Sequence, residues 1–290
     1  MFDFRYHALS LAAVFLALVV GLLLGIEIGD RGLVSSAEKK LRQSLRADVN
    51  SARKESQRLR DQLAFRARFE DEIYPDFVSG QLQDKRIGLL FIGRSSNRVA
   101  RLVRQQSLVG TGGRVVFVGV VREPLDLHGL ASRAEGTRYA AVDLGSDLIK
   151  PFGLRIGVQL TQGGRLVRRA RGKLFSSFSG ALGKLDGVVV VRDPADLKGE
   201  AARAAKLFED GLAEGLLSHT TPVVGVETKS TTPSQVPWYR DREMASVDDL
   251  DDIAGRMALV FTLAGADGAY GVKPTADALL PRVVGGVRGP

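Results

Sequence analysis

The chain has 290 residues, of which 44% are hydrophobic and 26% charged, a composition typical of a globular protein. It contains no cysteine, which excludes disulfides, cysteine-ligated zinc sites and thiol catalysis. The formal net charge of +8 favours anionic partners such as lipid head groups or acidic polymers. No zinc-finger or RNA-recognition motif accompanies the basic residues, so we expect no nucleic-acid partner.

An uncharged segment over residues 8–26 (ALSLAAVFLALVVGLLLGI) follows a short tail at 1–7. As a helix it would be about 28 Å long, which matches the ~30 Å hydrocarbon core of a bilayer. The sequence therefore predicts a transmembrane anchor over 8–29. A cleaved signal peptide is the alternative, but its apolar stretch is usually about 7–15 residues. The segment 34–37 (VSSA) resembles a cleavage site only weakly, so an uncleaved anchor is favoured.

Gly21, Gly25 and Gly29 recur every four residues and therefore share one face of the anchor helix. Small residues at this spacing let two membrane helices approach closely, so they predict pairing with a second copy or with another membrane protein. The alternative is that glycine is simply common in membrane helices.

The charges beside the anchor leave its orientation open. The tail carries Arg5 and the α-amino group, whereas residues 30–46 carry five basic and two acidic side chains. A count of positive residues places this second flank in the cytoplasm. The tail is very short, however, and long domains can cross a membrane largely regardless of charge.

Residues 30–74 are predicted to form a helical stalk, because 35–72 contain neither glycine nor proline. Leu41, Leu45, Ala52 and Leu59 follow a heptad-like spacing and predict a coiled-coil seam, weakened by polar residues at intervening seam positions. Such a stalk would hold a distal domain away from the membrane and pair two chains. The alternative is one solvated helix packed on its own domain. The segment 74–76 (YPD) is predicted to end this helix.

Residues 83–290 read as alternating strands and helices, which predicts a parallel, Rossmann-like α/β domain. Continuous apolar runs predict buried strands at 86–93, 114–121, 187–191 and 222–226. Helical spacing predicts helices at 99–108, 198–217 and 247–263. The last helix is predicted to begin with an acidic capping box at 246–249 (SVDD). Residues of about 125–185, richer in glycine and basic residues, are predicted to be a helical insertion.

No pattern of residues points to catalysis. The turn at 93–97 (GRSSN) lies where a phosphate loop would lie, but it lacks both GxGxxG and GxxxxGK[ST], so a plain strand-to-helix turn is expected. His7, His128 and His219 are scattered, and no nucleophile–base motif surrounds them. The sequence predicts no catalytic residue, no cofactor and no enzyme activity.

Metal ligands are equally sparse. Copper(I) prefers sulfur and copper(II) prefers imidazole, yet the chain has only three methionines and three histidines, none adjacent in sequence. An intrinsic copper site would have to be assembled across the fold or across chains. Four carboxylates could hold a hard cation, but we expect them to offset the dipole of a helix N-terminus. These are Asp248, Asp249, Asp251 and Asp252.

Five basic residues within nine positions are flanked by glycines and predict an exposed loop or ribbon. Either this is a solvated face, or it is a dock for anionic lipid, a wall polymer or an acidic partner. The residues are Arg165, Arg168, Arg169, Arg171 and Lys173.

The opening 4–18 (FRYHALSLAAVFLAL), the glycine-spaced anchor, the charged helix and the closing GAYGVK (268–273) and ALLP (278–281) together resemble the MctB-type copper transporter family, which includes SteB-type envelope proteins. The resemblance covers the chain from anchor to tail. It implies one N-terminal anchor in the cytoplasmic membrane with an extracytoplasmic soluble domain. It also implies one of two roles: copper export or homeostasis, with a channel, or a partner role in cell division and wall remodelling.

The residues bear unequally on these roles. A β-barrel channel needs strands of about ten alternating residues, whereas the predicted strands are short and continuously apolar. A channel would therefore need oligomers of the anchor, whose helix offers no polar lining. The residues favour a non-enzymatic scaffold, either a homodimer or a small complex with another envelope protein, with any copper role indirect or through oligomers. Direct copper efflux and SteB-like regulation of division are the alternatives.

Overall fold

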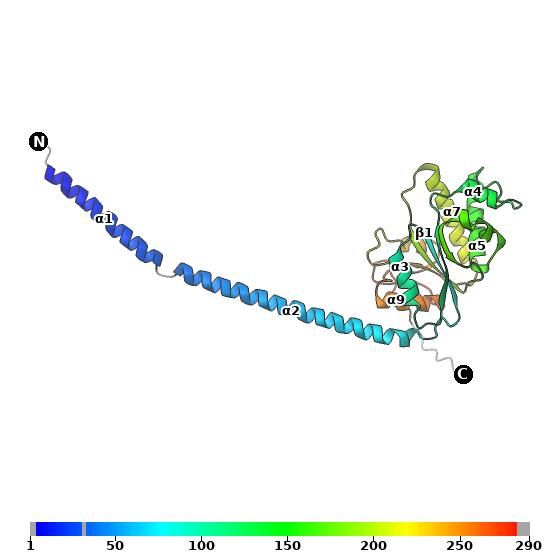
Figure 1. Cartoon of the computed structure of the whole chain (residues 1–290), viewed down its shortest axis with the longest axis horizontal. Coiled ribbons are helices and arrows are strands. Elements are labelled where there is room, and N and C mark those ends of the chain that lie inside the picture. Colours follow the sequence, from blue (N-terminus) through cyan, green and yellow to red (C-terminus); the bar gives the residue numbers. More distant parts are fainter. Residues whose placement is uncertain (1–3, 31–32, 283–290) are drawn as a thin grey trace. The chain divides into compact units, whose positions relative to one another are not determined.

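The computed structural model describes residues 4–30 and 33–282 (Figure 1). The chain divides into two units, Met1–Arg68 and Phe69–Pro290. The first unit contains helix α1 (Phe4–Asp30) and most of helix α2 (Leu33–Val78). The second unit, called the head below, contains the end of α2 and all the strands.

Helix α1 covers the segment predicted as an anchor. Over Tyr6–Ile26 its mean hydropathy is 2.8, so it is long and apolar enough to cross a membrane. Its leucine and valine side chains are exposed along this length, as those of a helix that contacts lipid would be. The structure thus has one helix, among the described residues, that qualifies as a membrane span.

Helix α2 does not end at the predicted 74–76 but continues through Pro75 to Val78. Proline lacks the N–H that a helix interior uses, yet the last turn is held by packing. Tyr74 and Val78 are buried in the head, and the Tyr74 hydroxyl donates to the Ser107 carbonyl at 2.6 Å. These tertiary contacts compensate for the hydrogen bond that Pro75 cannot make.

The head contains a seven-stranded sheet in the order β3-β2-β1-β4-β5-β6-β7. Only β3 is antiparallel to its neighbour, so the predicted α/β class with a mostly parallel sheet is confirmed. In chain order the strands are β1 (Arg86–Gly93), β2 (Arg114–Val121), β3 (Phe175–Gly180), β4 (Gly187–Asp193), β5 (Val223–Val226), β6 (Ala245–Val247) and β7 (Ala269–Tyr270).

Helices cover both faces of the sheet. Successive side chains of the central strands point to opposite faces, and the apolar side chains on each face are buried under helices. Leu90 and Ile92 face one core, built with helices α4 (Leu127–Arg133), α5 (Ile149–Gln162), α6 (Arg165–Leu174) and α7 (Gly199–Leu217). Leu89 and Phe91 face the other core, built with α3 (Asn97–Arg101), the π-helix η1 (Leu102–Ser107), α9 (Ile253–Leu263) and the last turn of α2. Figure 1 shows α5 and α7 on one side of β1, and α3 and α9 on the other.

The segment 125–185 contributes helices α4, α5 and α6, the short 3₁₀ helix η2 (Ser146–Leu148) and the edge strand β3. It is part of the layered architecture, because Phe152 and Ile156 of α5 and Val167 of α6 are fully buried in the first core. Phe175 begins β3 and packs in the same core. The segment therefore helps to cover the sheet.

The predicted final helix at 247–263 is wrong over its first six residues. Ala245–Val247 form β6, in register with Val224, Gly225 and Val226 of β5. The helix begins at Ile253 with Asp252 as its N-cap residue, so the predicted capping box at 246–249 does not exist. Pairing with β5 and β7 on either side outweighs the local helical pattern there. The short helix α8 (Val236–Arg240) precedes this strand.

Candidate functional site

Open α/β sheets bind ligands beyond the carboxyl ends of their strands, where neighbouring connections run in opposite directions. Here that point lies between β1 and β4, and the chain itself fills it. Gly93 has φ +89, and a Cβ at this position would overlap the Asp193 carbonyl oxygen. The Arg94 N–H donates to that oxygen at 2.7 Å, and the Arg94 guanidinium pairs with the Asp193 carboxylate at 2.7 Å. The turn after β1 is therefore a closed strand-to-helix turn, as expected.

A charged cluster at the end of β4 is also internally satisfied. Arg192 donates to Glu209 at 2.8 Å and to Gln235 at 2.5 Å. The guanidinium groups of Arg192 and Arg242 lie 4.9 and 4.0 Å from the centre of the Trp238 ring. Burial raises the pKa of Glu209, and the Arg192 charge opposes that rise. The cluster borders a cavity of about 230 Å³, but Arg192 is already paired with Glu209 and Arg242 with Asp210.

The closing GAYGVK segment is held by buried carboxylates. Lys273 Nζ donates to Glu227 Oε1 at 2.5 Å, and the Val272 N–H donates to Asp248 Oδ1 at 2.8 Å. A side chain at Gly271 would overlap the Asp248 carboxylate. Packing within the head therefore explains the residue types of the GAYGVK segment.

The four acidic residues at 248–252 do not form one group. Asp252 occupies the N-cap position of α9 without a side-chain capping hydrogen bond and pairs with Lys229 at 2.7 Å. Asp251 accepts from the Lys229 N–H at 3.0 Å. Asp249 is fully buried, and neither of its oxygens has a hydrogen-bond partner among the described residues. Burial, reinforced by the neighbouring Asp248 and Asp252 charges, raises the pKa of Asp249 to about 6.

The structure does not gather the histidines and methionines. His128 in α4 lies 3.1 Å from Asp143, and His219 after α7 lies 2.8 Å from the Ser218 hydroxyl. Met244 is buried, and Met1 lies outside the described residues. Within 4–30 and 33–282, no group of three His, Asp or Glu side chains is placed to hold a metal.

The two surfaces predicted for pairing lie on α1 and α2 in the first unit, and neither is covered by the described residues. In α1, nothing lies within 4 Å of a Cβ built on Gly21 or Gly25. Gly29 also lies in α1, but its surroundings fall outside the described side chains.

The predicted stalk seam is an exposed stripe on α2. Leu41, Leu45 and Leu59 are 60%, 54% and 50% exposed, and Ala52 is exposed between them. Val49 and Leu63, which the heptad reading missed, belong to the same stripe because each lies four residues after a stripe leucine. The spacing of four was the signal that could have found them. We call Leu41, Leu45, Val49, Ala52, Leu59 and Leu63 the stalk stripe.

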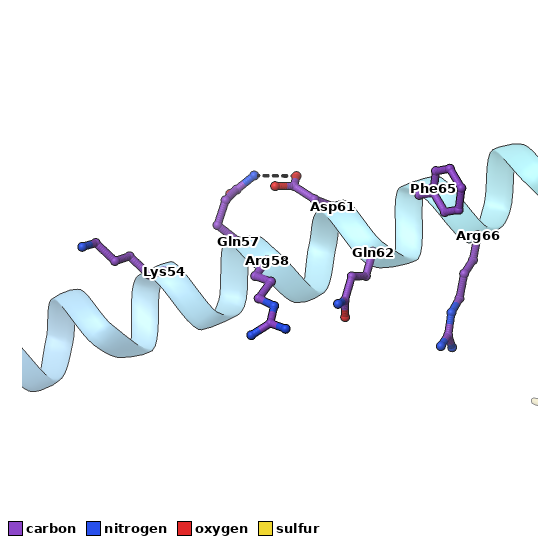
Figure 2. A pocket seen from close by; sticks show the side chains of 7 residues that line it. All are labelled: Lys54, Gln57, Arg58, Asp61, Gln62, Phe65 and Arg66. Atoms are coloured by element: carbon purple, nitrogen blue, oxygen red, sulfur yellow. Dashed lines mark hydrogen bonds between the residues drawn. The ribbon is translucent and has the colours of Figure 1, made fainter.

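Another face of α2 carries charged and amide side chains together with the exposed Phe65. Figure 2 shows that the side chains around the hollow there all project from one helix, so the hollow is an open helix surface. Gln57 donates to Asp61 at 2.9 Å, an i,i+4 contact within the helix. The side chains drawn are Lys54, Gln57, Arg58, Asp61, Gln62, Phe65 and Arg66.

The basic run at 165–173 forms helix α6, so the predicted loop or ribbon is wrong. Leu166, Val167, Ala170 and Leu174 recur at helical spacing and are buried, which fixes the helix on the first core.

The basic side chains of α6 have different surroundings. Lys173 pairs with Asp126 at 3.0 Å, and the Arg171 guanidinium lies 5.4 Å from the Phe178 ring centre. Arg168 is exposed. Arg165 and Arg169 instead line a hollow that also contains arginines from outside the run.

That hollow has a volume of about 560 Å³ and lies between the turn after α4, helix α5 and the start of α6. Arg138 and Arg155 join Arg165 and Arg169 in its wall. Sequence reasoning missed these two arginines because they are far from the basic run along the chain. We call it the arginine hollow.

The comparisons with known proteins agree with the resemblance seen in the sequence. A family model described as "Copper transport outer membrane protein, MctB" matches residues 1–123 and 165–281. The match covers helices α1 and α2 and all seven strands of the sheet, and it leaves out 124–164. A search of the curated proteins finds no match. Because the family model covers most of its length, the chain belongs to the MctB copper transport outer membrane protein family.

Proposed function

We propose that this chain is a non-enzymatic, membrane-anchored envelope protein that pairs through its anchor and stalk and binds partner proteins through its head. It is a single-pass protein of the cytoplasmic membrane with its head on the extracytoplasmic side. Its contribution to copper transport or homeostasis is indirect, or arises only in oligomers.

The observation that carries this proposal is the stalk stripe. Along α2, apolar side chains recur on one face from Leu41 to Leu63, and each leucine is at least half exposed. Outside the stripe α2 is mostly charged or polar, with Phe65 and Phe69 as exposed exceptions. Such a helix has little reason to keep an apolar stripe exposed unless a partner covers it. A second copy of α2 is the occupant with the matching length and spacing. The glycines of α1 would bring the same two chains together in the membrane.

The head supports a binding role over a catalytic one. Its topological switch point is filled by the Gly93–Asp193 contact, and the charged side chains nearby are partnered. The scattered His and Met side chains support an indirect copper role, because tight copper sites converge several soft or imidazole ligands. The alternative function for the same scaffold is regulation of cell division and wall remodelling, as in SteB-type proteins.

Pairing through the stalk stripe is tested by single-cysteine crosslinking of the full chain in membranes, since the chain has no native cysteine. Leu45→Cys and Leu59→Cys place the thiol on the stripe. Each should give a covalent dimer with a short bismaleimide. Lys54 lies nine residues after Leu45 and therefore about 180° around the helix from it. Lys54→Cys is the matched control, with an expected dimer yield at least fivefold lower. Equal yields from both faces, or monomer alone at every position, would refute pairing through this stripe.

The indirect copper role predicts that the purified full chain in detergent takes up neither Cu(I) nor Cu(II) tightly. Any weak Cu(II) binding should change less than twofold in His128→Ala, because Asp143 is the one potential metal ligand that His128 contacts among the described residues. Isothermal titration with each ion measures both values. Stoichiometric, tight binding by the unmodified chain would show that it handles copper directly.

A further inference from the structure

The arginine hollow concentrates positive charge from three separate segments of the head. Arg138 lies in the turn after α4, Arg155 on α5, and Arg165 and Arg169 on α6. All four side chains are exposed, so they can reach a ligand in the hollow without displacing packed residues.

The charges of these arginines are not compensated inside the protein. Among the side chains that the structure describes, none of the four forms a salt bridge with a carboxylate. Arg138 donates to the Tyr139 hydroxyl at 2.8 Å, and Arg169 donates to the Glu135 carbonyl at 3.2 Å. Both acceptors are neutral, so they orient the guanidinium groups and leave their charges to act on a ligand.

A buried amide adds a donor of fixed orientation. Gln159 on α5 is only 8% exposed and lines the hollow. Its Oε1 accepts from the Val167 N–H at 3.1 Å, which commits the oxygen. Its Nε2, in the described part of the chain, has no protein acceptor. The first turn of α6 lies beside it, where the positive end of the helix dipole also favours an anion.

We propose that the arginine hollow is a binding site for a ligand that carries two or more phosphate groups. The guanidinium fork matches phosphate oxygens in pairs, and four such forks exceed what one monoanion can neutralise. The volume of about 560 Å³ admits a ligand larger than a single phosphate. The site is separate from the stalk stripe, so it does not depend on the proposed pairing.

The family match covers only part of the arginine hollow. Arg138, Arg155 and Gln159 all lie in 124–164, outside the matched residues, whereas Arg165 and Arg169 lie inside them. The site is therefore formed jointly by the segment 124–164, which the family model does not match, and by α6, which it does.

The test titrates the full chain, in a neutral detergent at low salt, with tripolyphosphate as the probe. We expect saturable binding, weakened about tenfold in Arg155→Ala and in Arg165→Ala, as loss of a charge-assisted contact predicts. Arg168→Ala is the matched control, because it removes the same charge from the same helix outside the hollow and should change the affinity less than twofold. Arg165→Lys keeps the charge but loses the fork, so it should bind with intermediate affinity.

Two results would overturn the proposal. The first is the absence of binding by the unmodified chain. The second is equal weakening by Arg168→Ala and Arg165→Ala, which would reveal only diffuse attraction to a basic surface. Sulfate at matched ionic strength should not compete, since it offers a single anionic group.

The source of the phosphate groups is distinguished by repeating the titration in lipid nanodiscs. If nanodiscs containing a diphosphate lipid suppress tripolyphosphate binding relative to phosphatidylcholine nanodiscs, lipid head groups occupy the hollow. If both nanodiscs give the same affinity, the ligand is soluble. Both outcomes support the site, and they differ only in where its ligand comes from.

Discussion

Asp249 shows how a single residue departs from its local pattern. Its neighbours in sequence suggest a solvated helix N-terminus, yet its carboxyl group is fully buried without a partner in the described structure. A buried carboxylate is costly when ionised, which is why the pKa of Asp249 rises from 3.8 to about 6.

This predicts a pH dependence with a definite sign. Because the folded pKa lies above the unfolded value, the folded state binds the Asp249 proton more tightly. The stability that this proton provides is complete below about pH 4 and is lost as the pH rises through about 6. Asp249→Asn keeps a neutral group at every pH. Between pH 4 and pH 8 the unmodified chain should lose up to about 3 kcal/mol of unfolding free energy through the ionisation of Asp249. The Asp249→Asn variant should not show this loss.

Urea unfolding of the full chain, followed by the fluorescence of its single tryptophan, Trp238, measures this difference. Asp196→Asn, at an exposed position, is the control and should leave the pH dependence unchanged. A pH dependence identical in Asp249→Asn and the unmodified chain would show that Asp249 does not titrate in this range.

At the scale of elements, the contact between α5 and α7 depends on glycines. Gly153 and Gly157 on α5, and Gly211 and Gly215 on α7, repeat the spacing of four seen in the anchor. A Cβ at any of them would overlap backbone of the opposite helix. The backbones of the two helices therefore pack directly against each other. Glycines spaced four residues apart, which allow membrane helices to approach closely, here allow two helices of the head to do the same.

Gly157→Ala should destabilise the head by about 1–3 kcal/mol, because the added methyl group would overlap the Leu212 carbonyl oxygen. Gly172→Ala on α6 is the matched control. Nothing lies within 4 Å of a Cβ there, so alanine should stabilise the helix by about 0.5–1 kcal/mol. Urea midpoints of the two variants measure both effects. Stabilisation by both substitutions would contradict the close packing of α5 on α7.

The strands that sequence reasoning found and missed differ in composition. β1, β4 and β5 are continuous apolar runs because both of their faces are buried. β2 is an equally apolar run, although its first residues are partly exposed. Such runs are recognisable from the sequence alone. β3 reads FSSFSG, and β6 and β7 are three and two residues long. These three become strands only because an existing sheet edge offers them hydrogen bonds, a partner that no local pattern reveals.

At the scale of the whole molecule, the side of the membrane that holds the head decides which partners it meets. The proposed extracytoplasmic head predicts that Leu144→Cys reacts with a membrane-impermeant maleimide in intact cells as fully as in lysed cells. Leu144 is 83% exposed, so the reagent reaches it wherever the head is accessible. Ala213→Cys, at a position only 1% exposed, is the control and should react only after denaturation. Labelling of Leu144→Cys only after lysis would place the head in the cytoplasm.

The sequence by itself determined the features that depend on neighbours along the chain: the apolar anchor, the charged helix with its stripe, the buried strands, and the closing motifs that indicate the family. Tertiary structure decided what distant residues do together. It extended α2 through Pro75 by burying Tyr74 and Val78, turned 245–247 into a strand, and made the basic run a helix. It also gathered Arg138 and Arg155 beside Arg165 and Arg169. Burial and charge convergence depend on long-range contacts, and a pattern read along one chain does not contain them.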